Sequence, residues 1–357
     1  MKLNKPVMDW KHIGSALSRG SEGSYDADVT GDPCIVWDEE IKSWRMFYFA
    51  QRRDSNEKEY NSIAQATNSN SVFPDTGDWQ KQGPISYTNP EVVGDGAHKP
   101  WILMDPFCPN RAVKIDNQYI LFSATYIGHN KVIHIGRSSS LAGPWTMNPE
   151  PILNRGEKGD FDAYHVDTIT AYWFEEKQKI LLYYKGYPED IQTDQPSSPY
   201  GSSTAAALID PTNDKLEKLG KIIMPSDKSF MSGWISTPQL FPADQGGWYG
   251  IITGSPSSPV SIEEEPHMRE PAPSLGGWAY TSEEFPVEGW ELLPDPITTL
   301  EEIPGEAKEW GEIVNLWRHH ILVLKDGSLR LYYNSGAYGN ERMFCRKGSS
   351  IVPKKGN

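Results

Sequence analysis

The stretch Gly31-Asp-Pro-Cys-Ile-Val-Trp-Asp38, followed after a short turn by Trp44-Arg-Met-Phe-Tyr-Phe-Ala50, decides the fold. The first segment has the composition of a short apolar strand, and the second is an aromatic-rich strand that ends on a small residue. The same pair recurs four more times, at residues 112–115 with 119–124, 169–174 with 180–186, 240–241 with 248–254, and 321–324 with 329–336. Five copies of one hairpin predict an array of repeated antiparallel sheets.

A third strand and an outer strand complete each repeat. Third strands are predicted at residues 61–67, 132–137, 204–208, 278–281 and 343–346. Outer strands are expected near the turns Leu141-Ala-Gly-Pro-Trp145 and Phe285-Pro-Val-Glu-Gly-Trp290. One such sheet cannot bury both of its faces, whereas a ring of sheets buries them against one another.

We therefore predict an all-β, five-bladed β-propeller that forms a single domain over residues 1–357, with its active site in a funnel on the axis. The blades are expected at roughly 25–90, 98–155, 160–225, 230–298 and 309–350, with the N-terminal segment helping to close the ring. The 357 residues include 13 Trp, 17 Tyr and 28 Pro, and no long run has the period of an amphipathic helix.

The charge of the chain restricts its partners. A net charge of −14 disfavours nucleic acid and anionic membranes, because both would meet a protein of like sign. No apolar stretch reaches membrane-spanning length, and the first ten residues lack the core of a signal peptide. We expect a cytoplasmic monomer or homodimer, or a secreted or periplasmic protein if a leader has been trimmed.

The three cysteines, Cys34, Cys108 and Cys345, are widely separated and show no metal-ligand spacing. They are interpreted as core thiols of a protein from a reducing compartment. The stretch from Ser255 to Ser274 is interpreted as a surface loop, with a lid over the funnel as the alternative.

Polar residues stand where the inner strands are predicted to begin, and such residues line the funnel of a propeller. Asp28 and Asp32 precede the inner strand of blade 1, and Asp167 opens that of blade 3. The equivalent positions in the other blades are assigned to Asn110 and Arg111, to Ser236 or Thr237, and to His319 or His320.

With its Asp32-Pro33 motif and the strand Arg45-Met-Phe-Tyr-Phe49, the chain resembles the five-bladed propeller glycosidases of glycoside hydrolase families 43, 32 and 68. Families 117 and 130 are more distant relatives in architecture. The stretch Asp167-Thr-Ile-Thr-Ala-Tyr-Trp173 looks like the second Asp element of family 43, and residues 138–145 look like an outer strand of these enzymes. The resemblance implies a glycosidase that cleaves a terminal bond of a plant or algal oligosaccharide, such as an α-L-arabinofuranoside or a β-xyloside.

The chain departs from the families at one important place. Family 43 has its general acid, a Glu, at the opening of blade 4, where this chain has Ser232-Gly-Trp-Ile-Ser-Thr-Pro-Gln239. The Arg-Asp-Pro motif of family 32 corresponds here to Met104-Asp105-Pro106, and its Glu-Cys pair is missing. Two alternatives stay open: a non-catalytic carbohydrate-binding propeller, and a phosphorylase like family 130, in which Arg111, Arg318, His319 and His320 would hold phosphate.

Glycoside cleavage needs an acid and a second carboxylate, which acts as base or nucleophile. Asp32 is predicted as the base or nucleophile, although an Asp before a strand also caps turns. Asp167 would support it, and Asp28 would contact sugar hydroxyls. The acid is left open among three candidates, Glu312, Asp167 and His165, and a funnel that also contained Asp105 could keep one carboxyl protonated.

The remaining predicted substrate contacts are aromatic, hydroxyl and basic side chains: Trp101, Trp234, Trp310, Thr237, Arg111, His319 and His320. Indole rings stack on the C–H faces of sugars, although core packing explains the three Trp equally well. We expect no required cofactor and assign no metal ligand, leaving open a structural Ca²⁺ or another ion in the central channel.

Overall fold

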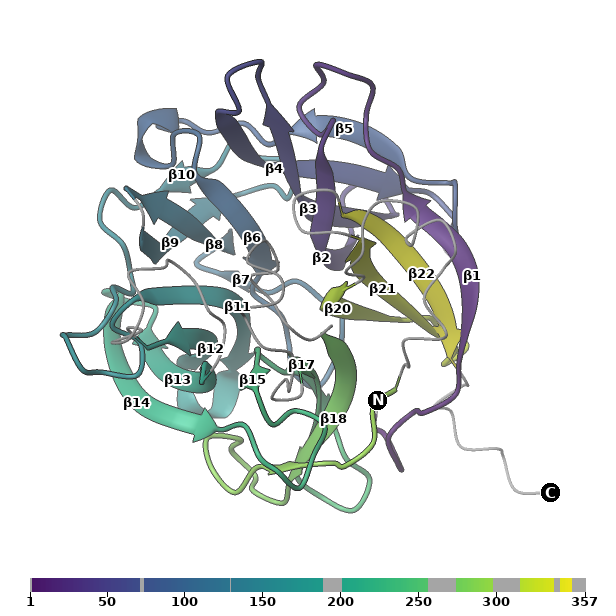
Figure 1. Cartoon of the computed structure of the whole chain (residues 1–357), viewed down its shortest axis with the longest axis vertical. Helices are drawn as coiled ribbons and strands as arrows, with labels where there is room; N and C mark the ends of the chain where they lie inside the picture. Colours follow the sequence, from purple (N-terminus) through teal and green to yellow (C-terminus); the bar gives the residue numbers. More distant parts are fainter. Residues whose placement is uncertain are drawn as a thin grey trace, which may run out of the picture.

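The computed structural model describes residues 2–70, 74–128, 130–188, 201–255, 274–297, 315–336 and 341–348. These residues form five antiparallel sheets that surround a common axis as the blades of a propeller (Figure 1). The predicted all-β, five-bladed architecture is confirmed.

Each blade runs from an inner strand at the axis to an outer strand at the rim. Blade 1 contains β2 (Val29–Asp38), β3 (Ser43–Arg53), β4 (Glu59–Asn68) and β5 (Gln80–Pro84). Blade 2 contains β6 (Ala97–Ile102), β7 (Lys114–Ile115), β8 (Gln118–Ile127), β9 (Asn130–Ser138) and β10 (Thr146–Met147). Blade 3 contains β11 (His165–Phe174), β12 (Lys179–Tyr187), β13 (Ser203–Asp210) and β14 (Lys215–Ile223). Blade 4 contains β15 (Trp234–Ile235), β16 (Gln239–Pro242), β17 (Trp248–Ser255), β18 (Leu275–Thr281) and β19 (Glu291–Leu292).

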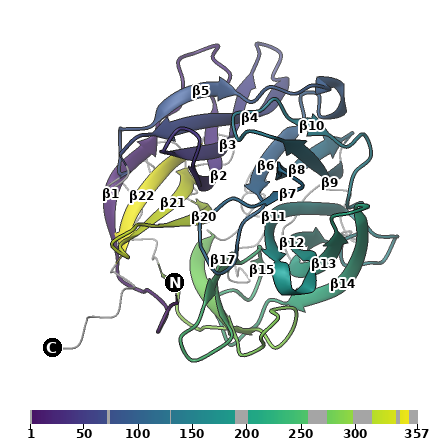
Figure 2. The same ribbon diagram turned by 180° about the vertical axis from the view of Figure 1, so that it is seen from behind.

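Blade 5 joins the two ends of the chain. Its strands β20 (Asn315–Val323), β21 (Leu329–Gly336) and β22 (Arg342–Gly348) are followed in space by β1 (Trp10–Leu17), which pairs with β22. Figure 2 shows β1 and β22 side by side at the rim of this blade. Two short 3₁₀ helices, η1 (Pro90–Val92) and η2 (Glu175–Lys177), lie in connections.

The predicted hairpins coincide with observed strand pairs in four blades, and the assignment of the inner strand of blade 2 was wrong. The predicted segment 112–115 forms only the short β7, whereas the inner strand is β6, whose Trp101 pairs with Phe122 of β8. The backbone of β6 bulges at Lys99 and Pro100, and these two residues interrupt the apolar pattern of the strand. At the level of Asp32, the inner strand of blade 2 therefore carries His98 and Lys99. Asn110 and Arg111 do not occupy this position.

Side chains fill the axis. Asn110 donates from Nδ2 to the carbonyl oxygens of Ile35 and Ile321, both at 3.1 Å, and His320 Nε2 lies 2.8 Å from the same nitrogen. Gln239 of blade 4 exchanges two hydrogen bonds with the backbone of Ile321. Polar contacts thus join the inner strands of blades 1, 4 and 5 at this level.

The inner strands bulge at one level. Shifts of register occur between Gly31 and Cys34, between His98 and Trp101, and between Asp167 and Ile169. A fourth occurs in β20, between Leu316 and His319. The residues inside the first three bulges have positive φ: Asp32 at 49°, Lys99 at 52° and Thr168 at 38°. Because a bulge re-aims the side chains beside it, this level is where the inner strands can present polar groups at the end of the propeller.

Candidate active site

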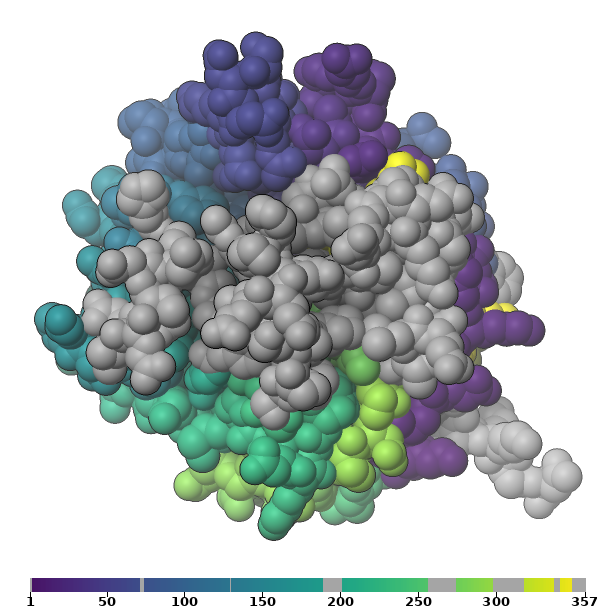
Figure 3. Space-filling view, viewed as in Figure 1, coloured from purple at the N-terminus to yellow at the C-terminus, as the bar shows by residue number. Residues whose placement is uncertain are grey.

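A cavity of about 90 Å³ lies over blades 1, 2 and 5, at the level of these bulges. Most of its lining residues are polar, and the lining comprises Val29, Asp32, Phe49, Gln51, Arg53, Glu59, Asn61, His98, Lys99, Tyr126, Lys131, Asn334 and Glu341. Five of these residues come from the β3–β4 hairpin. Figure 3 shows this hairpin in indigo, projecting at the rim beside the purple segment that precedes β2.

Asp32 is the predicted catalytic residue that lines the cavity. Its backbone N–H donates to Asn334 Oδ1 at 3.3 Å, and the same oxygen accepts the N–H of Arg318 at 3.2 Å. A Cβ atom at Gly31 would come within 2.9 Å of Asn334 Nδ2, so glycine is required for this close approach. Asn334 therefore fixes the bulges of β2 and β20 to each other.

The side chain of Asp32 is only 5% exposed. Burial raises the pKa of its carboxyl above the ordinary value, and the nearby Asp167 acts in the same direction. Lys99, Arg318 and Lys131 oppose this shift by favouring the ionised form. Asp32 is thus a carboxyl whose proton affinity is increased at the wall of a cavity, which is a common property of catalytic acids and bases.

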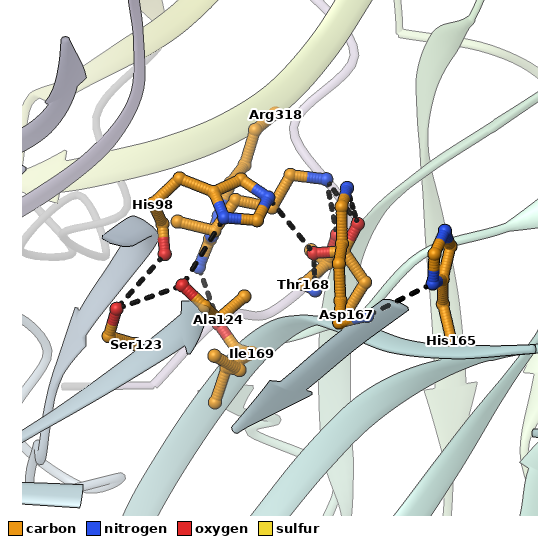
Figure 4. A network of polar contacts seen from close by, with 10 residues as sticks. His98, Ser123, Ala124, His165, Asp167, Thr168, Ile169 and Arg318 are labelled. Carbon is orange, nitrogen blue, oxygen red and sulfur yellow. Dashed lines mark hydrogen bonds and ion pairs between the residues drawn. The ribbon is translucent and has the colours of Figure 1, made fainter. Parts of the chain in front are cut away.

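Asp167 lies behind this wall, fully buried (Figure 4). Its Oδ2 accepts from the ammonium groups of Lys99 at 2.8 Å and Lys131 at 2.9 Å, and its Oδ1 accepts the N–H of Thr168 at 2.7 Å. Burial alone would raise the pKa of Asp167, but Lys131 and Lys99 outweigh it and hold this pKa well below the usual range. The two predicted aspartates are therefore in opposite electrostatic environments.

His98, which sequence reasoning missed, separates Asp167 from the aromatic wall. Its ring stacks on Tyr126 at 5.1 Å, and its Nδ1–H donates to the Ala124 carbonyl at 3.2 Å. Burial, and then the charge of Lys131, lowers the pKa of His98 well below its ordinary value. Nε2 of this neutral ring carries a lone pair, and within the part of the chain that the structure describes it receives no hydrogen bond.

His165, a predicted candidate for the acid, is also neutral. Its Nδ1 accepts the backbone N–H of Lys131 at 3.1 Å, and burial lowers its pKa to about 3. Figure 4 shows His165 beside Asp167, on the side away from His98. A ring that is unprotonated at neutral pH is a poor proton donor, so this geometry argues against His165 as the general acid.

Asp105 and Arg111 are not brought to the cavity. They form an ion pair with each other, with the Arg111 side chain 63% exposed. The backbone of Arg111 forms an isolated β-bridge with Trp37. Trp37 lies five residues after Asp32, toward the opposite end of β2. Both residues were predicted at the site because the inner strand of blade 2 was assigned to residues 112–115 instead of β6.

The other predicted contacts lie near the cavity or in the core, outside its lining. Asp28 Oδ2 accepts the backbone N–H of Arg53 at 2.5 Å. Trp101 is fully buried and donates to the Ala171 carbonyl at 3.0 Å, while the Trp234 ring lies under the Lys185 ammonium at 3.7 Å. Thr237 is buried in blade 4.

The two histidines of blade 5 are buried structural residues. Thr253 Oγ1 lies 2.6 Å from His319 Nδ1, and His320 belongs to the axial network with Asn110. Burial lowers the pKa of each ring to about 3. Glu312 and Trp310 lie outside the described residues, as do residues 256–273 of the predicted surface loop.

The lining residues that sequence reasoning did not predict as site residues come from blades 1, 2 and 5: Val29, Phe49, Gln51, Arg53, Glu59, Asn61, His98, Lys99, Tyr126, Lys131, Asn334 and Glu341. A sequence signal existed for one of them, because Lys99-Pro100 repeats the Asp32-Pro33 pattern at the same bulge. Lys131 and Asn334 belong to strands other than the inner one, where no local pattern marks them.

Within the described ranges, no group of three or more His, Cys, Asp or Glu side chains could hold a metal ion. Of the cysteines, Cys34 and Cys345 are buried as predicted, while Cys108 is exposed because it lies in the β6–β7 connection instead of a strand. No helix among the described segments has the length and apolar character needed to cross a membrane.

Comparison of the sequence with protein-family models and with curated proteins finds no match. The fold, by contrast, is similar to many solved structures. A structure titled "Glycoside hydrolase" has a TM-score of 0.70 at 11% identity, covering 98% of this chain and 94% of that chain. An endo-arabinase from Bacteroides thetaiotaomicron has a TM-score of 0.58 at 13% identity, covering 98% of this chain and 100% of its own.

A third structure comes from work on glycoside hydrolase family 130, whose title describes mannoside phosphorylases and hydrolases that target β-1,2-mannosidic linkages in Candida mannan. It has a TM-score of 0.64 at 14% identity, with 99% of each chain covered. At these identities the likeness establishes the fold, and the propeller is the one found in glycoside hydrolases.

Proposed function

We propose that the chain is a glycosidase that cleaves a terminal bond of an oligosaccharide, with Asp32 as the reacting carboxyl. One observation carries the proposal: a buried carboxyl in a strained bulge lines a cavity, beside a second aspartate held ionised by two lysines. Non-glycine residues with positive φ are costly and gather at active sites. The similarity to glycoside hydrolase propellers supports the same function.

Cleavage needs a second carboxyl, and we assign this role to Glu341. Of the three acidic residues in the cavity lining, Glu59 is half exposed and paired with Arg53, whereas Glu341 is 7% exposed. Glu341 directly precedes β22, and its backbone carbonyl accepts the N–H of Thr30 from β2 at 3.2 Å. This contact holds it beside the strand that carries Asp32.

In the proposed mechanism, Glu341 gives its proton to the glycosidic oxygen as the bond from that oxygen to the anomeric carbon breaks. Ionised Asp32 takes a proton from an attacking water, or attacks the anomeric carbon itself in a two-step reaction. Asp167 supports Asp32 by fixing Lys99 and Lys131, whose charges favour the ionised form of Asp32.

A phosphorylase is less well supported. Arg111, one of its four predicted phosphate ligands, is exposed and lies away from the cavity, and His319 and His320 are neutral and buried. The likeness to the family 130 structure keeps this reaction worth testing. A non-catalytic carbohydrate-binding propeller is the third alternative.

The test is hydrolysis of a panel of aryl α- and β-glycosides, including α-L-arabinofuranosides, β-xylosides, hexosides and hexuronosides, with and without phosphate. We expect Asp32→Asn and Glu341→Gln each to lower turnover by about 10²- to 10⁴-fold. Asp210→Asn, which removes the half-buried partner of Lys179 in blade 3, is the matched control and should retain activity. Full turnover by Asp32→Asn would refute the mechanism, and turnover that requires phosphate would establish a phosphorylase.

A further inference from the structure

We propose that the cavity selects a sugar that carries a carboxylate, and that Lys99 and Lys131 bind this group. The inference rests on the proposed function, because it names the substrate class of the same site. It goes beyond it in predicting an acidic glycoside, such as a hexuronoside, in place of a neutral sugar.

The first support is the charge of one wall of the cavity. Lys99 and Lys131 both line the cavity, with side chains 18% and 12% exposed, and both donate to the single oxygen Oδ2 of Asp167. Asp167 itself is fully buried and is not part of the lining. Two ammonium groups thus share one oxygen of a buried carboxylate, and both lysines line the cavity.

Arg318 is a third cation close to Asp32. Its guanidinium is buried behind the wall, stacks near Trp101 at 5.4 Å and donates from Nη2 to the Ile169 carbonyl. In the described part of the chain its Nη1 has no hydrogen-bond partner. Three cations, Lys99, Arg318 and Lys131, thus act on the Asp32 carboxyl.

The backbone of Lys99 gives a second, independent support. Lys99 has a φ of 52°, a conformation that costs a non-glycine residue of order 1–3 kcal/mol and that glycine would adopt without strain. Its ammonium also donates to Thr168 Oγ1 at 3.3 Å, which fixes its direction. Lysine at a site that favours glycine indicates that its charge is needed there.

The rest of the lining suits a sugar ring. Phe49 and Tyr126 offer aromatic faces for its C–H groups, and Gln51 and Asn61, which hydrogen-bond to each other at 2.9 Å, offer amide groups to its hydroxyls. The cavity thus combines a cationic wall with the features of a carbohydrate site.

A sugar carboxylate fits this wall better than inorganic phosphate. Phosphate at neutral pH brings nearly two negative charges into a lining that already holds the carboxyls of Asp32, Glu59 and Glu341, whereas a sugar carboxylate brings one. Phosphate sites also favour the bidentate guanidinium of arginine. Arg53, the arginine in the described lining, is already paired with Glu59 at 3.2 Å.

Binding is measured first, by calorimetry on Asp32→Asn, so that hydrolysis does not interfere. Each probe pair differs only at C6: methyl glucuronoside against methyl glucoside, and methyl galacturonoside against methyl galactoside, as both anomers. We expect at least one uronoside to bind about tenfold or more tightly than its neutral partner. Equal binding of the partners in every pair, or binding of neither, would overturn the inference.

The role of the lysines is tested by adding Lys99→Met or Lys131→Met, with Lys179→Met on the surface of blade 3 as the matched control. The uronoside preference should disappear in the first two and persist in the control. Lys99→Arg keeps the charge and should retain part of the preference, which separates lost recognition from misfolding. A preference that survives both Met variants would overturn the assignment.

Two further outcomes separate this inference from the proposed function. Hydrolysis of neutral glycosides only, with no uronoside preference, would leave the glycosidase standing and overturn the acidic substrate. Uronoside binding that depends on the lysines, without hydrolysis by the wild type, would support carboxylate recognition and overturn the glycosidase. Inorganic phosphate that binds through Lys99 and speeds turnover would make phosphate the anion and refute the sugar carboxylate.

Discussion

Replacing Asp167 with Asn tests whether one buried carboxylate holds the site together. Asn keeps the shape of the side chain and an oxygen for the Thr168 N–H, but it removes the negative charge between two ammonium groups. Lys99 and Lys131 would then lose the carboxylate that both contact. We expect a large loss of stability from a substitution that removes almost no volume.

The distances set the magnitude. Both ammonium nitrogens lie on one oxygen, at 2.8 and 2.9 Å, so by the sum of these distances they are at most about 5.7 Å apart. At an effective dielectric constant of about 20, two like charges at this separation repel by about 3 kcal/mol. Breaking a buried ion pair by removing one partner typically costs about 3–5 kcal/mol, so this is the loss expected for Asp167→Asn.

Urea unfolding at pH 7 measures this loss, and a second variant tests its cause. In the double variant Asp167→Asn/Lys131→Met only one lysine remains, so the double variant should be more stable than the single variant by at least about 1 kcal/mol. Asp210→Asn removes the partner of the half-buried Lys179, which lies 2.7 Å away, and should unfold close to the wild type. A loss below about 1 kcal/mol for Asp167→Asn, or no gain in the double variant, would refute the shared-carboxylate arrangement.

The same loss should depend on pH in a defined direction. The folded pKa of Asp167 is lowered, so its contribution is fully present above the unfolded pKa of about 3.9 and is lost as pH falls toward the folded value. The stability difference between wild type and Asp167→Asn should therefore be constant from about pH 5 to 7 and shrink below about pH 4. A difference that stayed unchanged at acidic pH would contradict the ionised, buried state of Asp167.

Three further predictions follow from the site and the core. Since Lys99 lowers the raised pKa of Asp32, the rise of kcat/KM with pH should shift to higher pH in Lys99→Met, and an unchanged pH profile would contradict Asp32 as the reacting group. Trp101→Ala should cost about 3–5 kcal/mol in urea unfolding because its ring is fully buried, and a cost near zero together with lost substrate binding would restore the stacking role. Thr168→Gly should relieve the strain of φ 38° and leave stability unchanged or higher while it lowers turnover, and unchanged turnover would show that the Lys99–Thr168 contact does not matter.

The sequence predicted the blades well because their signals are local. A hairpin of apolar strands such as β2 and β3 is buried on both faces, so its residues form an unbroken apolar and aromatic run that a reader can find without a structure. Blade 2 was misassigned because β6 carries Lys99 and Pro100 at its bulge. The polar bulge residues that mark the site in β6 thus also interrupt the apolar run by which an inner strand is recognised in the sequence.

A second repeat could also have been found in the sequence. Residues 19–27 and 155–163 share Arg-Gly, a Gly three residues later and an aromatic residue before Asp-Ala. The structure gives both the same backbone hydrogen bond, from Gly20 to the Asp26 carbonyl and from Gly156 to the Asp162 carbonyl, each at 3.0 Å. These turns lead into β2 and β11, so the repeat marks the two blades that supply Asp32 and Asp167.

The rest of the site could not be predicted, because it depends on contacts between blades. Lys131 is the second residue of β9 and Asn334 lies near the end of β21, at positions where exposed polar residues are ordinary. They become part of the site only because neighbouring blades bring Asp167 and Asp32 within reach of them. No spacing along the chain encodes such a meeting.

The bulges explain how one repeated fold produces a chemically varied cavity. Asp32, Lys99 and Thr168 occupy the same position of three inner strands, each with positive φ and each beside the cavity or its supporting carboxylate. Glycine would be the unstrained choice at all three positions, yet the chain has an acid, a base and a hydroxyl there. Strain at a single site can be an accident of packing, but strain at three equivalent sites that are joined through Asp167 indicates that the chain gives up stability to hold charged groups at this end of the propeller.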